Sequence, residues 1–302
     1  SLQQLIQGII SRSTQLAAAS EETSAITLQT TQAIREQKIP VKVVVVSGDI
    51  QPEARERVMA FGALDFIRKP VDSHKLQQLM QQHAIAISCA TRTDNTTPLT
   101  PSVELGADMR DVLQELTNVA MGQAGDLLAR LLNVFVKLPI PNVNLIEVSE
   151  LHMALASVEH ESTTSAVCQG FIGGGVSGEA LLILTDSSFK DIARLMNYQA
   201  ELNVKTELEL LMDVANILIG AVLKGLAEQI DMSFSQGHPV VLGQHAPVSE
   251  LIKANAQRWR KTLAIELSYG IENYDIRCDL MLLFTEDSLK TLNYKVAFLL
   301  EG

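Results

Sequence analysis

The stretch DVLQELTNVAMGQAGDLLARLL, residues 111–132, decides the fold of this chain because the chain holds a second copy of it. The second copy is ELLMDVANILIGAVLKGLAEQI, residues 209–230. A shift of 98 residues (209 minus 111) aligns five pairs: Asp111 with Glu209, Glu115 with Asp213, Asn118 with Asn216, Gly122 with Gly220, and Pro141 with Pro239. A repeat of this length predicts two copies of one structural unit.

Each copy has the pattern of an amphipathic helix. At about 100° per residue, positions i, i+4, i+7 and i+11 fall within one narrow stripe. In both copies that stripe carries two acids, an asparagine and a glycine. The opposite side is apolar: Leu113, Leu116, Ala120 and Leu127 in the first copy, and Leu211, Val214 and Leu218 in the second. We therefore predict two helices that bury one side and present a polar row on the other.

The two glycines of the stripe, Gly122 and Gly220, have two interpretations. Glycine costs a helix interior about 1 kcal/mol relative to alanine. Either something approaches the helix backbone closely at these positions, or the glycines only let two helices pack. The acidic row on a single helix is most simply a solvated face. Duplication preserves fold, so the repeat demonstrates shared structure before shared chemistry.

The spaced pattern resembles the duplicated active-site motif of the CheC/CheX/FliY family, chemotaxis phosphatases that dephosphorylate CheY-type receiver domains. The matching positions are an acid, a second acid four residues later, an asparagine three residues after that, and a proline 23 residues further on (141 minus 118). The resemblance covers residues 103–302. The second copy departs from the family pattern, because Asp213 stands where the family has glutamate and Glu209 where it has aspartate or serine.

The resemblance implies that the chain hydrolyses the aspartyl phosphate of a CheY-type receiver. Asn118 and Asn216 would orient the attacking water, a role that suits a carboxamide because it both donates and accepts hydrogen bonds. Glu115 and Asp213 would grip a lysine of the partner. The supporting motif residues are Asp111, Gly122, Pro141, Glu209, Gly220 and Pro239. The phosphatase domain needs no cofactor, and Mg²⁺ is expected on the phosphorylated partner receiver.

Two other functions compete with the phosphatase interpretation. Related flagellar-switch proteins share the family's fold without the motif and act as scaffolds, so a non-catalytic receiver-binding module is the main alternative. A metal-dependent hydrolase is disfavoured, because the sequence shows no His or Cys cluster with ligand spacing and we predict no metal site.

Residues 1–87 predict a first unit of alternating helices and strands, which means a parallel sheet. The helices are expected over residues 1–10, 21–37, 51–62 and 73–84, and the strands over residues 41–49 and 63–70. The second half of this unit resembles a response-regulator receiver, a flavodoxin-like domain. The resemblance rests on a strand ending in Ser47, the turn at residues 61–63, and the pair Lys69-Pro70. It implies that Ser47 and Lys69 contact a phosphoryl group.

The first half of this unit departs from the receiver pattern. The first 48 residues contain no aspartate, the first and third strands are not recognisable, and the phosphoacceptor is unknown. Either the receiver is degenerate and cannot be phosphorylated, or segments of the natural protein are absent from the sequence. The presence of Ser47 and Lys69 favours the second explanation. The unit is open to three roles: regulator of the phosphatase, dimerisation unit, or substrate.

The Thr-rich, Pro-containing residues 88–102 predict a linker. The domain that follows, residues 103–302, is predicted to consist of two pseudo-symmetric α+β halves, about 103–200 and 201–302. LLILTDSSFK at residues 181–190 matches MLLFTEDSLK at residues 281–290, so the repeat extends beyond the motif helices. We expect further strands over residues 151–159, 166–172 and 179–185. The glycines of residues 173–175 predict a hairpin turn rather than a phosphate loop, and residues 186–197 a helix capped by Asp or Ser. One antiparallel sheet should be shared by both halves, with both motif helices on one side.

Composition narrows the choice of partners and compartment. The net charge of −11 argues against nucleic acid or an anionic membrane as a partner. Cys89, Cys168 and Cys278 are far apart and are interpreted as small hydrophobic residues. No signal peptide and no uninterrupted apolar run of 18 residues is recognisable. We expect a soluble, cytoplasmic protein whose oligomeric state, including a homo-oligomer, the sequence leaves open.

Overall fold

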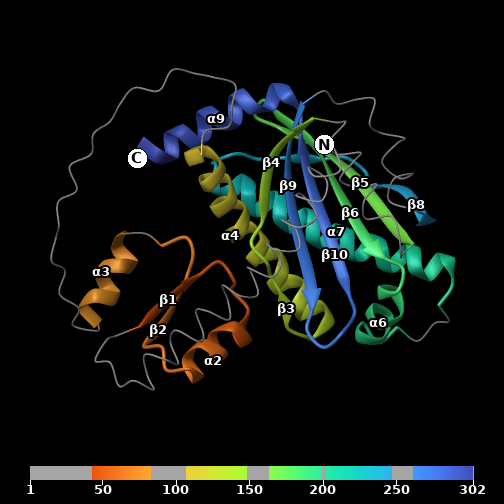
Figure 1. Ribbon diagram of the computed structural model, residues 1–302, viewed down its shortest axis with the longest axis horizontal. Coiled ribbons are helices and arrows are strands. Elements are labelled where there is room, and N and C mark those ends of the chain that lie inside the picture. Colours follow the sequence, from red (N-terminus) through yellow and green to blue (C-terminus); the bar gives the residue numbers. More distant parts are fainter. Residues whose placement is uncertain are drawn as a thin grey trace, which may run out of the picture.

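The structure is a computed structural model that describes residues 43–71, 73–82, 107–147, 163–198, 202–246 and 261–301. These residues form a small α/β unit and a larger α+β domain (Figure 1). The expected helices over residues 1–10 and 21–37, the linker over 88–102, and the strand over 151–159 lie outside the described residues.

The N-terminal unit, residues 43–82 as described, is a parallel strand pair with two helices. It comprises β1 (Val44–Ser47), α2 (Pro52–Ala60), β2 (Asp65–Arg68) and α3 (Ser73–Gln82). β1 and β2 run parallel, with Ser47 opposite Arg68, which confirms the predicted parallel sheet. Pro52 occupies the first turn of α2, where its missing N–H costs nothing.

The larger domain consists of two halves with the same order of elements. The first half contains α4 (Ala107–Leu132), β3 (Val136–Lys137), β4 (Asn142–Glu147), β5 (Thr164–Gly173), β6 (Val176–Thr185) and α6 (Ser188–Leu195). The second half contains α7 (Val204–Gln229), β7 (Ser235–Gln236), β8 (Val240–Ala246), β9 (Lys261–Ile271), β10 (Arg277–Phe284) and α9 (Glu286–Glu301). The predicted motif helices are thus α4 and α7.

The two halves share one antiparallel sheet, as predicted. Within the described residues it has eight strands in the order β3-β9-β10-β6-β5-β7, with β4 also on β9 and β8 also on β5. The short strands after each motif helix therefore pair with the long strand of the other half: β3 and β4 with β9, and β7 and β8 with β5. Because of this exchange, neither half can form its side of the sheet alone.

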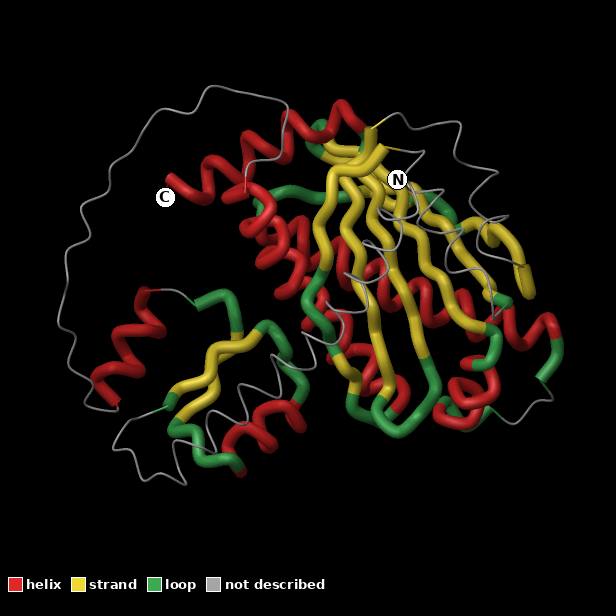
Figure 2. Tube along the Cα trace, viewed as in Figure 1, coloured by secondary structure: helices red, strands yellow, loops and turns green. Residues whose placement is uncertain are grey.

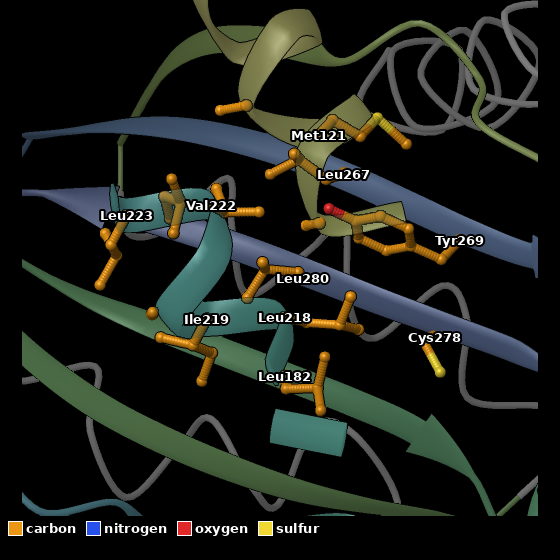
Figure 3. Packing of buried hydrophobic residues seen from close by; sticks show 14 of the residues in the cluster. Met121, Leu182, Leu218, Ile219, Val222, Leu223, Leu267, Tyr269, Cys278 and Leu280 are labelled. Carbon is orange, nitrogen blue, oxygen red and sulfur yellow. The ribbon is translucent and has the colours of Figure 1, made fainter. Parts of the chain in front are cut away.

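The motif helices α4 and α7 cover the same face of this sheet (Figure 2). Figure 3 shows Leu218 and Val222 of α7 among Leu182, Leu267 and Leu280 of the strands, all of them buried. The helices also contact each other, since a β-carbon built on Gly225 of α7 would lie 3.1 Å from the Ala120 Cα of α4. The glycine that serves helix packing is therefore Gly225, which lies outside the repeated motif.

One local expectation was wrong, and a second is met only in position. Leu127 is 46% exposed although it was expected on the buried side of α4, because the buried row there runs through Ala124 and Leu128. The N-cap of α6 is a serine, Ser187, as expected, but its side chain makes no capping hydrogen bond. The neighbouring Asp186 carboxylate instead accepts hydrogen bonds from the Ser165 hydroxyl and pairs with the ring of His245.

The glycine-rich segment forms the predicted hairpin. Gly173 pairs with Val176 across a two-residue turn, in which Gly174 and Gly175 have φ values of 57° and 84°. Positive φ at both central positions is typical of a type I′ hairpin turn and favours glycine. The turn joins β5 to β6, and no helix follows at which a phosphate could bind.

Candidate functional site

The first motif helix carries an ion pair with the N-terminal unit. Lys69, which directly follows β2, places its Nζ 2.7 Å from Oε1 of Glu115 on α4. The Glu115 side chain is 49% exposed and that of Lys69 is 29% exposed. A half-exposed pair of this kind contributes at most about 1 kcal/mol. Its main effect is therefore to set which part of the N-terminal unit faces the motif stripe.

Gly122 permits the closest approach in this contact. A β-carbon built on Gly122 would lie 1.9 Å from the carbonyl oxygen of Gly48, the residue after β1, and 3.3 Å from the amide nitrogen of Asp49. A β-carbon built on Gly48 would in turn lie 3.4 Å from the side-chain nitrogen of Asn118. Two backbones without side chains thus meet here, and the half-buried Asn118 carboxamide lies over the loop at the carboxyl end of β1.

The buried polar contact of this interface comes from Gln51. Its Nε2 donates to the carbonyl oxygen of Val136 at 2.7 Å, and its Oε1 accepts from the Val136 amide at 2.9 Å. Both residues are buried, with exposed fractions of 2% and 0%. Val136 belongs to β3, an outer strand of the sheet, so the Gln51 amide acts as one further hydrogen-bonding partner at that edge. Loss of this partner would leave buried backbone groups unsatisfied, at a cost of about 1–3 kcal/mol.

Arg57 of α2 makes a further contact with the larger domain. Its guanidinium donates from Nη1 to Oε1 of Glu272 at 2.9 Å and stacks 4.1 Å from the centre of the Phe135 ring. Nη2 also contacts the second oxygen of Glu272 and bonds Glu53 on its own helix. Hydrogen bonding to Arg57 lowers the pKa of Glu272. This forked pair is a charge-assisted contact with defined geometry.

Ser47 and Asp49 complete the N-terminal side of the contact. The Ser47 hydroxyl accepts a hydrogen bond from the Asp49 amide at 3.1 Å, and the Ser47 carbonyl accepts one from the Lys69 amide at 2.9 Å. Burial raises the pKa of Asp49, partly offset by hydrogen bonds from Gln51. The predicted pair Ser47 and Lys69 therefore lies side by side at the carboxyl end of the parallel strands, the edge at which α/β sheets bind ligands.

The second motif helix presents the same stripe without a cover from the described residues. Asp213 and Asn216 of α7 are exposed, and a β-carbon built on Gly220 would meet nothing within 4 Å. Glu209 is also exposed but already has partners, because it accepts a hydrogen bond from the Tyr198 hydroxyl at 2.5 Å and has the Lys205 ammonium 3.8 Å away. Asp213 is therefore the acid of this stripe that is available to a cation.

The two prolines of the motif mark corresponding places. Pro141 immediately precedes β4, is buried, and its carbonyl accepts a hydrogen bond from Nε2 of Gln114 on α4 at 2.8 Å. Pro239 immediately precedes β8. Each proline thus directly precedes a strand that pairs with the other half, and Pro141 is joined to α4 through the Gln114 side chain.

The structure thus brings Ser47, Lys69, Glu115, Asn118 and Gly122 together and leaves the stripe of α7 apart from them. Sequence reasoning did not find the contacts of Gly48, Gln51, Arg57 and Glu272. A glycine directly after the apolar, valine-rich strand was the one available signal, at Gly48; that strand was expected to be buried, but β1 is only partly buried, with Val46 exposed. The other three are ordinary surface residue types whose role depends on what is packed against them.

Two features of the described residues bear on other classes of function. They contain no group of three or more His, Cys, Asp or Glu side chains placed to hold a metal ion. One described helix, Val204–Gln229, is long and apolar enough to span a membrane, but 61% of its apolar window is buried inside the protein. That burial is the pattern of a core helix, and Figure 3 shows its side chains packed among those of the strands.

The arrangement defines a domain of two fused halves with a repeated acid–acid–Asn–Gly helix face. The sequence matches no protein-family model and no curated protein. Similar solved structures are FliY from Thermotoga maritima (19% identity, 64% of this chain and 98% of that chain covered, TM-score 0.46) and CheX from Desulfovibrio desulfuricans (14%, 56% and 99%, 0.39). The FliM middle domain from H. pylori is similar as well (14%, 63% and 99%, 0.44).

Proposed function

We propose that the protein hydrolyses the aspartyl phosphate of a CheY-type receiver domain. In this proposal Glu115 and Asp213 hold the receiver's lysine, and Asn118 and Asn216 orient the attacking water. The observation that supports it best is the contact between Lys69 and Glu115, at 2.7 Å, because the motif glutamate meets a lysine at the carboxyl edge of a parallel sheet. This edge is where the phosphoryl group of a receiver-like fold would lie.

Hydrolysis of an aspartyl phosphate requires few catalytic groups from the motif helix. The oxygen of one water attacks phosphorus, the bond between phosphorus and the carboxylate oxygen breaks, and the aspartate leaves with the electron pair. Inorganic phosphate is released with the protons of the water shared between phosphate and solvent. The receiver's own lysine and Mg²⁺ bind the phosphoryl oxygens. A carboxamide that holds water in line lowers the barrier by positioning, so no general base or nucleophile is required from the helix.

The geometry near Asn118 suits this role. Its carboxamide lies against the backbone of Gly48, at the end of β1, and one helical turn before Gly122. The helix can come so close only because both Gly48 and Gly122 lack side chains. A flat helix face, rather than a deep pocket, fits a substrate whose phosphate lies at the edge of its own domain.

Release of phosphate from a separately phosphorylated CheY-type receiver tests the proposal. Wild type would be compared with Asn118→Ala, Asn216→Ala and the double variant. Because a small misplacement of a reacting group costs roughly 100-fold, the double variant should lose most of the acceleration while receiver binding remains. A receiver that binds wild type but loses phosphate no faster than alone would instead identify a scaffold.

A further inference from the structure

The two motif stripes differ in what covers them. On α4, the stripe lies under the N-terminal unit: Glu115 pairs with Lys69, and Gly122 contacts the backbone of Gly48. On α7, Asp213 and Asn216 are exposed, and no described residue would lie within 4 Å of a β-carbon built on Gly220. The sequence repeat gave no sign of this difference, because the two stripes carry the same residue types at the same spacing.

We infer that the first site is occupied by the chain's own N-terminal unit, and that the second site on α7 binds a receiver domain of a separate protein. The inference rests on the proposed function only for the identity of the ligand, a receiver, since the contacts of the α4 stripe and the exposure of the α7 stripe among the described residues are observed. The N-terminal unit thus shows how a ligand docks on such a stripe. Its lysine pairs with the second acid of the stripe, and its glycine backbone lies against the glycine of the helix.

The chemistry of the α7 stripe selects the same kind of ligand. Glu209 is held by Tyr198 and Lys205, so its charge is already partly balanced. Asp213, one turn further along, has no described hydrogen bond or ion pair and carries a negative charge towards solvent. A lysine at the edge of a receiver sheet complements that charge. Gly220 leaves room for the receiver backbone to lie directly on the helix, as Gly48 does on Gly122.

The partner must come from another protein rather than from a second copy of this chain. In each copy, Lys69 and Gly48 are engaged by the α4 stripe of the same molecule. Gln51 and Arg57 hold the unit there through Val136 and Glu272. The surface that would dock on α7 is therefore already buried in the copy that would supply it. A second copy could dock on α7 only after its own N-terminal unit had left its α4 stripe.

The stoichiometry of receiver binding tests the inference without any catalytic readout. The probe is a CheY-type receiver activated with beryllofluoride, titrated into the full chain by calorimetry. Wild type should bind one equivalent. Gly220→Ala should weaken that binding at least about tenfold, because the added methyl blocks backbone contact. Gly237→Ala is the matched control, because Gly237 is exposed, lies outside both stripes, and would place its β-carbon at an ordinary 3.5 Å from the Gly170 carbonyl oxygen; it should leave the measured affinity unchanged.

A charge reversal distant from both stripes opens the first site. Arg57→Glu should release the N-terminal unit, because the new carboxylate repels Glu272, and the chain should then bind two equivalents. Adding Glu272→Arg should restore one equivalent. This rescue separates release of the unit from a general loss of structure.

Other results would overturn the inference. They are two equivalents on wild type, no binding of any activated receiver, or binding that survives Gly220→Ala and is lost in Gly122→Ala. A wild-type dimer that becomes monomeric in Gly220→Ala would show a second copy on α7 and would also overturn it. Receiver binding with one equivalent but no faster dephosphorylation refutes the proposed function and leaves this inference standing. Faster dephosphorylation that depends on Asn118 rather than Asn216 would refute this inference and leave the proposed function standing.

Discussion

Replacing Gly122 by alanine should release the N-terminal unit, and the same change at Gly220 should not. The new β-carbon at position 122 would lie 1.9 Å from the Gly48 carbonyl oxygen. Real β-carbons essentially never come within 3.0 Å, so the Gly48 backbone has to retreat by roughly 1 Å or more. Overpacking of this kind costs about 1–3 kcal/mol, which corresponds to a shift of about 5–150-fold in the docking equilibrium.

The Val136 amide reports this equilibrium. Its N–H donates to the Gln51 side chain at 2.9 Å, so its protection from hydrogen exchange depends on docking. Exchange at Val136 should speed up by about 5–150-fold in Gly122→Ala. In Gly220→Ala it should stay as in wild type, while α7 gains about 0.5–1 kcal/mol of intrinsic helix stability. Unchanged exchange in Gly122→Ala would refute the idea that this glycine is required for the approach of Gly48.

Further predictions concern the contacts around the site and the core. Gln51→Ala should weaken docking by about 1–3 kcal/mol and Lys69→Ala by at most about 1 kcal/mol, as seen in amide exchange, because only the first change leaves buried groups unsatisfied; equal effects would contradict this ranking. Gly225→Ala should lower the melting temperature, because its β-carbon would lie 3.1 Å from the Ala120 Cα, and the backbone of α4 cannot turn aside as a side chain can; an unchanged melting temperature would argue against close helix packing there. Hydrogen bonding to Asp186 raises the pKa of His245 above its ordinary value of 6.5, so its stabilising contribution is complete below pH 6.5 and declines as the pH rises through the raised value. Melting curves on both sides of pH 6.5 should show this decline in wild type and not in His245→Gln.

The sequence by itself determined the repeat and therefore most of the larger domain. Two helices with an apolar side and an acid–acid–Asn–Gly row follow from residue spacing alone, and the structure confirms both, together with the shared antiparallel sheet. The hairpin at Gly174 and Gly175 was also predictable, because such a turn depends on the local backbone conformation that glycine allows. The parallel strands of the N-terminal unit followed from their apolar runs.

Tertiary structure alone decided which strand pairs with which and which stripe is covered. Both motif glycines looked alike in the sequence, yet Gly122 contacts the N-terminal unit while Gly220 has no contact from the described part of the chain. Gln51 could not be singled out, because its role depends on the free hydrogen-bonding groups of an outer strand 85 residues away. Sequence periodicity reports which side of a helix is polar. What that side touches depends on long-range packing, for which a local pattern carries no signal.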